Sequence, residues 1–148
     1  YVSRLKATTE HFEANFDSLE TRTKFQYGNL LLEMGKYKES IEIYNSLNES
    51  SPKWSCPWRH KGEAYYNLND LANAEKSFLK AIETRIEHYD AYVWLAKTQK
   101  EMGRYKEALK SLEIGLSYKG KDIEDPEEEV ATSEVDALHE ELKKLVKK

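Results

Sequence analysis

Cys56 and His60 are the two residues of this sequence whose types and spacing suggest chemistry. Four residues apart, they would share one face of a helix, where a thiol and an imidazole can form a nucleophilic pair or half of a metal site. The rest of the sequence gives this idea no support, because it has a single cysteine and no His-Glu-x-x-His pattern. Its six glycines form neither a dinucleotide-binding nor a phosphate-binding loop. We therefore interpret the spacing as a coincidence, and predict no catalytic residue, no cofactor and no metal site.

The composition of the 148 residues predicts a helical protein. Gly and Pro are scarce, at 6 and 3 residues, which argues against a β-sandwich. Charged residues make up 34% of the chain, compared with the usual ~25%. Aromatic residues make up 11%, which is too many packing residues for a disordered chain.

The net charge of −4 is unevenly distributed along the chain. Residues 121–136 hold eight acidic residues and one lysine, so this segment carries −7 and the remainder +3. We interpret the segment as a solvated acidic connector, with docking on a basic partner as the alternative. The remainder lacks the concentrated basic face of a nucleic-acid binder, and no apolar run is long enough to span a membrane. We therefore expect no nucleic-acid partner and no membrane insertion.

A short motif recurs along the chain at a fixed distance. Residues 34–40 read MGKYKES, residues 102–108 read MGRYKEA, and residues 68–74, midway between them, read LNDLANA. The step is therefore 34 residues. Small residues that let two helices approach closely recur at this step, and so do large apolar residues that can fill the gap between hairpins. The small positions are Gly28, Gly62 and Ala96, and Ser40, Ala74 and Ala108; the large ones are Tyr44, Phe78 and Leu112.

With these columns the sequence resembles the tetratricopeptide repeat (TPR) family, whose 34-residue unit is a helix–turn–helix with small residues at set places. The resemblance implies an all-α solenoid of helical hairpins, with units at 21–54, 55–88 and 89–122. Gly35, Asn69 and Gly103 then fall where each first helix must end in a left-handed residue. Lys24 and Gln99 depart from the large packing residues of the other units, and we expect them to loosen the packing locally.

The same register implies helices near 21–34, 37–49, 56–68, 71–85, 89–102 and 105–117, with Ser55 capping the third of them. Residues 123–148 are expected to form an acidic connector and a capping helix over 126–147. The helix would begin at Asp125-Pro126, and its apolar stripe would cover the open face of the third unit. This stripe consists of Val135, Leu138, Leu142 and Leu145. Residues 1–20 are expected to be an N-terminal helix or cap, or the remnant of an upstream repeat.

The resemblance also implies where a partner would bind. In this family the first helix of each hairpin lines the concave side of the superhelix. Its long stems, aromatic faces and polar groups suit an extended peptide or a partner helix. The residues expected to line this groove are Arg22, Phe25, Asn29 and Leu32 in the first unit, Arg59, Glu63, Tyr66 and Asn67 in the second, and Val93, Lys97 and Lys100 in the third.

One group within the family, the co-chaperones, holds the C-terminal carboxylate of heat-shock chaperones with a clamp of Lys and Asn residues and a final Arg or Lys. At the corresponding places this sequence has Phe25 and Asn29, then His60, then Asp90 and Trp94. Only Asn29 matches the clamp, and Asp90 would repel a carboxylate. The sequence therefore predicts that the chain does not hold a heat-shock chaperone in this way.

These observations predict a protein–protein interaction module or scaffold that performs no reaction. Two alternatives stay open. The chain could self-associate through its end faces or its last helix, or it could be the TPR domain of a longer protein whose activity lies elsewhere. The missing initiator Met favours the second alternative. Because there is no signal sequence and only one thiol, we expect a cytoplasmic location.

Overall fold

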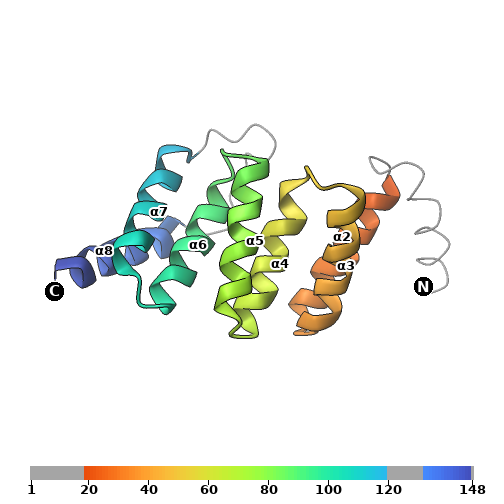
Figure 1. The fold of residues 1–148 in the computed structure, drawn as a ribbon, viewed down its shortest axis with the longest axis horizontal. Coiled ribbons are helices and arrows are strands. Elements are labelled where there is room, and N and C mark those ends of the chain that lie inside the picture. Colours follow the sequence, from red (N-terminus) through yellow and green to blue (C-terminus); the bar gives the residue numbers. More distant parts are fainter. Residues whose placement is uncertain (1–18, 120–131, 148) are drawn as a thin grey trace.

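A computed structural model describes residues 19–119 and 132–147, and in these residues it contains seven α-helices and no strand. The helices are α2 (Leu19–Glu33), α3 (Tyr37–Ser50), α4 (Ser55–Asn67), α5 (Leu71–Thr84), α6 (Tyr89–Glu101), α7 (Tyr105–Ser117) and α8 (Thr132–Lys147) (Figure 1). The first six helices begin and end within two residues of the predicted positions. Residues 1–18 of the predicted N-terminal segment 1–20, the predicted acidic connector, and residues 126–131 of the predicted capping helix, with its start at Asp125-Pro126, lie outside the described residues.

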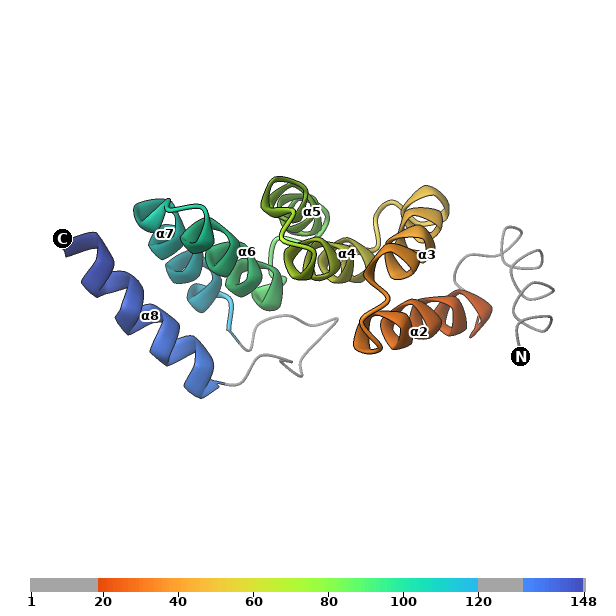
Figure 2. The same cartoon turned by 90° about the horizontal axis from the view of Figure 1, so that it is seen from below.

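The helices pair in chain order into three hairpins, α2–α3, α4–α5 and α6–α7, which stack side by side. Figure 2 shows α2, α4 and α6 in one row and α3, α5 and α7 in another, with α8 at the end beside α6 and α7. The predicted all-α hairpin solenoid is therefore confirmed. Its concave face is the row made by α2, α4 and α6.

Each hairpin turn contains one residue in the left-handed region, as the sequence predicts. Gly35 and Gly103 have φ of 79° and 80°, and Asn69 has φ of 63°. An added Cβ at Gly35 or Gly103 would meet nothing within 4 Å, so the backbone conformation, and not a lack of space, favours glycine there.

Glycine serves a different purpose inside the helices, where it allows the two helices of a hairpin to touch. A Cβ on Gly62 would lie 2.5 Å from Cε1 of Phe78, closer than two carbon atoms can pack. The large column residues Tyr44, Phe78 and Leu112 are each 0% exposed. The repeat columns therefore act as predicted, with a small residue in one helix admitting a ring or a leucine from the next.

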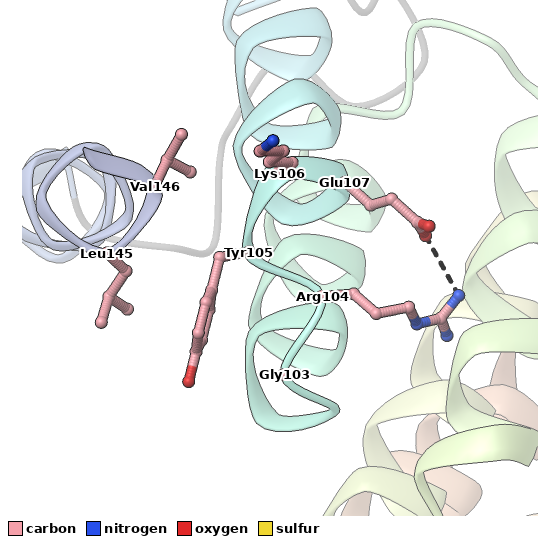
Figure 3. A pocket seen from close by; sticks show the side chains of 7 residues that line it. All are labelled: Gly103, Arg104, Tyr105, Lys106, Glu107, Leu145 and Val146. Carbon is pink, nitrogen blue, oxygen red and sulfur yellow. Dashed lines mark hydrogen bonds and ion pairs between the residues drawn. The ribbon is translucent and has the colours of Figure 1, made fainter. Parts of the chain in front are cut away.

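Helix α8 covers the open side of the third hairpin. Its residues Val135, Leu138 and Leu142 are buried in one cluster with Val93 and Leu112. This is the predicted capping stripe, and its burial removes the apolar face that a terminal hairpin would otherwise expose. The last turn of α8, with Leu145 and Val146, instead borders a hollow beside the turn between α6 and α7 (Figure 3).

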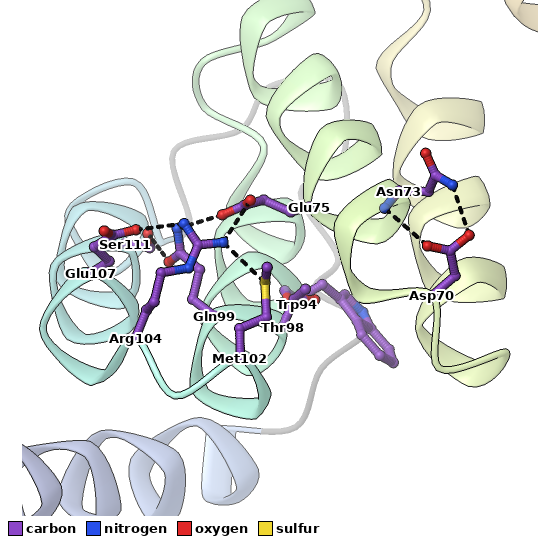
Figure 4. Close-up of polar contacts among 10 residues, drawn as sticks. All are labelled: Asp70, Asn73, Glu75, Trp94, Thr98, Gln99, Met102, Arg104, Glu107 and Ser111. Atoms are coloured by element: carbon purple, nitrogen blue, oxygen red, sulfur yellow. Dashed lines mark hydrogen bonds and ion pairs between the residues drawn. The ribbon is translucent and has the colours of Figure 1, made fainter.

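The prediction that Lys24 and Gln99 loosen the packing is wrong, because both side chains are buried and hydrogen-bonded. Lys24 is 8% exposed, and its ammonium donates to the hydroxyl of Ser46. Gln99 is 6% exposed and joins a polar network that links α5, α6 and α7 (Figure 4). Its amide nitrogen donates to Glu75 at 3.3 Å, and its amide oxygen accepts from Ser111 at 2.7 Å. A polar residue at a packing position is tolerated when its hydrogen bonds are satisfied.

The predicted cap at Ser55 is also wrong. Ser55 is the first residue of α4, and its hydroxyl donates to the carbonyl of Ala81 at 2.8 Å. The same oxygen lies 2.6 Å from Nδ1 of His88. Because the single hydroxyl proton is used on Ala81, the imidazole is the donor in this second bond. Ser55 therefore ties the start of α4 to the end of α5 and the start of α6, and does not cap its own helix.

Candidate functional site

The first helices of the three hairpins bring most of the predicted groove residues onto one face, but with very different exposure. Arg22 and Asn67 are exposed, whereas the side chains of Leu32, Tyr66 and Lys97 are half-buried. Because α2, α4 and α6 are neighbours in one row, residues at repeated positions line up across the concave face (Figure 2). This face is the candidate site.

At the α2 end of the face, two predicted residues are engaged by the fold. The ring of Phe25 stacks on the imidazole of His60, with centroids 5.0 Å apart, and lies 4.7 Å from the ring of Trp54. The side-chain oxygen of Asn29 accepts a 2.6 Å hydrogen bond from the hydroxyl of Tyr44. Both side chains remain half-buried.

Arg59 does not present its guanidinium to an open surface, because it is only 2% exposed. Its Nη1 lies 3.5 Å from a carboxylate oxygen of Glu63, and its Nη2 lies 3.1 Å from Nε2 of His60. Burial, and then the charge of Arg59, lower the pKa of His60 well below its ordinary value. The imidazole is therefore neutral and can accept from the guanidinium. The prediction that Arg59 lines the groove is therefore corrected. Arg59 is buried, and it contacts Glu63 and His60.

Val93 is not exposed on the face either. It is 0% exposed and belongs to the cluster formed with Val135, Leu138 and Leu142 of α8. The prediction that Val93 lines an open groove is wrong, because the capping helix covers this position.

The middle of the face is built around Trp94, which the sequence indicated only as a position that does not match the carboxylate clamp. One face of its indole stacks on Phe78 at 6.1 Å, and the ring edge of Tyr66 approaches it at 5.5 Å. The ammonium of Lys97 lies 4.5 Å from the centroid of the indole. Such a cation over an aromatic ring gains electrostatic stabilisation while its donors stay available. The repeat register could have indicated this position, because Trp94 follows His60 by one step of 34 residues. His60 contacts Phe25 and Tyr44 where the second hairpin packs on the first.

Charge at the α6 end of the face is balanced by the capping helix. The ammonium of Lys100 lies 2.8 Å from a carboxylate oxygen of Glu141. Lys97 has the indole of Trp94 beside it, and Tyr66 has its pKa raised by burial and by the nearby carboxylate of Glu101. The face therefore offers both signs of charge beside aromatic surface.

Cys56 and His60 are engaged by different neighbours. The sulfur of Cys56 lies 3.9 Å and 4.0 Å from the two terminal nitrogens of Arg85, while His60 contacts Phe25 and Arg59. Among the described residues no group of three or more His, Cys, Asp or Glu side chains could hold a metal ion. In the same part of the chain, no helix has the length and apolar character needed to cross a membrane.

Comparison with known families places this geometry in context. The family model described as tetratricopeptide repeat matches residues 21–53, 58–85 and 89–122, which together make up more than half of the chain. Among curated proteins, the human protein O-mannosyl-transferase TMTC2 is 28% identical over 101 residues, which are 64% of this chain and 12% of that protein. Tetratricopeptide repeat protein 37 of Xenopus laevis is 29% identical over 93 residues, 63% of this chain and 6% of that protein. The chain thus spans only a small part of these relatives.

Solved structures show the same arrangement of helices. A complex of the TPR2B domain of yeast Sti1 with a pHsp70 peptide superposes with a TM-score of 0.75 at 17% identity, covering 86% of this chain and 98% of that one. The Yersinia enterocolitica type III secretion chaperone SycD, in complex with a peptide of the translocator YopD, gives 0.76 at 16% identity, covering 90% and 99%. At these identities the likeness establishes the fold.

Proposed function

Because the chain belongs to the tetratricopeptide repeat family, we propose that it is a protein-interaction module whose concave face binds an extended segment or a helix of a partner protein. The observation that carries this proposal is the group formed by Tyr66, Trp94 and Lys97 at the centre of the face. Neighbours of the same fold, the Sti1 domain and SycD, bind peptides of partner proteins.

This group has the properties of a peptide-binding surface. Phe78 and Tyr66 hold the indole of Trp94 in place, so Trp94 would lose little side-chain entropy when a partner docks against it. Rigid aromatic side chains and cations with free donors are the usual anchors of interfaces. Lys97 can pair with a partner carboxylate or carbonyl, and Asn67, Asn29 and Leu32 extend the surface along the face.

We further propose that the partner is not held by a carboxylate clamp. Asn29 is engaged by Tyr44, and the carboxylate of Asp90 is 3% exposed at a position where a clamp needs a cation. Trp94, at the other such position, is packed on Phe78. The transferase activity in the name of one relative belongs to a protein of which this chain matches 12%, so the proposal concerns binding alone.

The proposal is tested with two variants that change net charge equally. In the groove variant, Arg22→Glu and Lys97→Glu alter exposed or half-buried positions on α2 and α6. In the control variant, Lys76→Glu and Lys110→Glu alter exposed positions on α5 and α7, in the other row of helices. Circular dichroism confirms that both variants are folded before use.

A random peptide library displayed on phage is selected on the native chain, and one selected peptide is titrated into all three proteins. We expect the groove variant to bind at least about tenfold more weakly, a loss of about 1.4 kcal/mol, and the control to bind as the native chain does. When the peptide binds to the native chain, the NMR chemical shifts of backbone amides should change in α2, α4 and α6. If the groove variant binds the peptide as tightly as the native chain and the shift changes are confined to α3, α5 and α7, the peptide binds on the convex face. This result would refute the proposal.

A further inference from the structure

The first hairpin exposes a face that the other two hairpins bury. In α4, His60 contacts Phe25 and Tyr44 of the preceding hairpin. In α6, Trp94 contacts Tyr66 and Phe78 of the preceding hairpin. Residues four positions later lie on the same side of a helix, and these residues, Ala64 and Thr98, are both 0% exposed. This side is therefore the one by which a hairpin packs on the hairpin before it.

The equivalent side of α2 carries Gln26, Leu30 and Met34, one step of 34 residues before His60, Ala64 and Leu68. Gln26 is exposed, Leu30 is 45% exposed and Met34 is 57% exposed. These three residues, four apart, form one strip, which we call the head strip. At Leu30 it presents a leucine where the inner hairpins carry a buried alanine or threonine, whereas Leu68, the equivalent of Met34, is itself 39% exposed. The part of the strip around Gln26 and Leu30 is therefore a packing face without a described partner helix.

The opposite end of the solenoid has an apolar hollow. It is bordered by Tyr105 and by Leu145 and Val146 of α8, and we call it the tail hollow (Figure 3). The charged residues Arg104 and Glu107 border it as well. The earlier turns of α8 expose Asp136 and Glu140 to the outside, so the end face of α8 is apolar only near its last turn. Lys106 also borders the hollow, and the exposed Lys144 and Lys147 follow nearby in sequence.

The head strip and the tail hollow lie at the same edge of the solenoid. The turns of the three hairpins lie along the lower edge of Figure 1, and Met34 is in the first of these turns. Helix α8 runs in the direction of α6, because Val135 packs with Tyr89 near the start of α6 and Val146 lies beside Gly103 just after its end. If a second copy continued the stack, its head strip would meet the tail hollow. Glu33, exposed beside Met34, would then approach the lysines around the hollow.

We propose that copies of this chain associate head to tail, with the head strip of one copy packed in the tail hollow of the next. The contact lies beside α8, which already covers the third hairpin as α4 and α6 cover the first and the second. It joins two different surfaces, so it is heterologous, and each added copy leaves one free head and one free tail. This contact uses the ends of the solenoid and leaves the concave face open.

The experiment uses the whole chain and three variants. Leu30→Glu blocks the head and Val146→Glu blocks the tail. Leu79→Glu is the matched control, because Leu79 is 48% exposed on α5, away from both ends. Sedimentation velocity from low concentration to about 1 mM covers the range of weak association, and circular dichroism checks that each variant is folded.

We expect the mass of the native chain and of Leu79→Glu to rise with concentration beyond that of a dimer, while each end-blocked variant stays monomeric. An equimolar mixture of the two end-blocked variants should form a dimer and nothing larger, because it contains one intact head and one intact tail. A native chain that stays monomeric throughout would overturn the proposal. So would association that Leu30→Glu abolishes and Val146→Glu leaves intact, because that result indicates a symmetric head-to-head contact.

Discussion

The first and second hairpins meet at one junction, and the second and third hairpins meet at another. The two junctions use the same repeat positions but different side chains. At the first junction, the ring of Phe25 lies between Trp54 and His60, and Tyr44 lies 6.1 Å from the same imidazole. At the second, Trp94 takes the place of His60 and stacks on Phe78. The second junction also has the network in which Arg104 and Gln99 both donate to Glu75, the former at 2.7 Å (Figure 4).

The difference shows how a repeat tolerates departures from its own pattern. A large apolar residue is missing at Gln99, and the neighbouring helices supply Glu75 and Ser111 as partners. Arg104 is 36% exposed at its side chain, so its pairing with Glu75 is screened by water and contributes little. The buried rings therefore account for most of the stability of the second junction, and the polar network mainly satisfies Gln99.

Removing a ring from each junction gives the largest expected effects and a direct comparison. Phe78 is 0% exposed, so Phe78→Ala should lower the free energy of unfolding by about 3–5 kcal/mol. Phe25→Ala removes a half-buried ring, and its effect should be smaller. Urea unfolding followed by circular dichroism measures both, with Leu79→Ala as the exposed control. Equal losses at the two positions would show that the first junction is as tightly packed as the second.

Acid should weaken both junctions through buried histidines. Burial, and then the charges of Arg85 and Arg59, lower the pKa of His88 to about 2, and burial also lowers the pKa of His60. Both are neutral in the fold, whereas an unfolded histidine titrates near pH 6.5. Below that pH the unfolded chain binds more protons, so stability is present above pH 6.5 and falls as pH falls. Each histidine should contribute about 1.4 kcal/mol per pH unit.

The variants His88→Asn and His60→Gln separate these contributions. The amide nitrogen of an asparagine at position 88 can still donate to Ser55, but it does not titrate. Urea unfolding between pH 7 and about pH 5 should therefore show a shallower dependence of stability on pH in each variant than in the native chain. A slope in His88→Asn identical to that of the native chain would mean that His88 binds as many protons in the folded state as in the unfolded state.

The smallest expected effect is the coupling between Glu75 and Arg104. A double-mutant cycle with Glu75→Gln and Arg104→Met should give a coupling of about 0.2–1 kcal/mol, because the pair is partly exposed. The variant Gln99→Leu restores the apolar residue of the other units and should change stability by less than about 1.5 kcal/mol. A coupling of several kcal/mol would instead show that the polar network contributes much of the stability of the second junction.

The sequence by itself determined the repeat, the hairpin turns and the capping stripe. These depend on the types of residues at short, fixed separations: Gly35, Asn69 and Gly103 end helices because of their own backbone preferences. Gly62 admits Phe78 because the hairpin of α4 and α5 places them opposite each other. Most of the candidate face, including Tyr66 and Lys97, could be named from the resemblance to the family, in which the first helix of each hairpin lines the concave side.

Only the tertiary structure decided which of the named residues remain accessible. Val93 is buried by α8, whose packing residues lie about forty positions later in the chain. The sequence pattern around Val93 does not indicate this long-range contact. Arg59 is buried beside His60 and Glu63, and Ser55 bonds to His88 because the end of α5 returns to the start of α4. Periodicity assigns each side chain to one side of its helix. Exposure and hydrogen-bond partners depend on which distant elements pack against that side, and this is decided by the assembled fold.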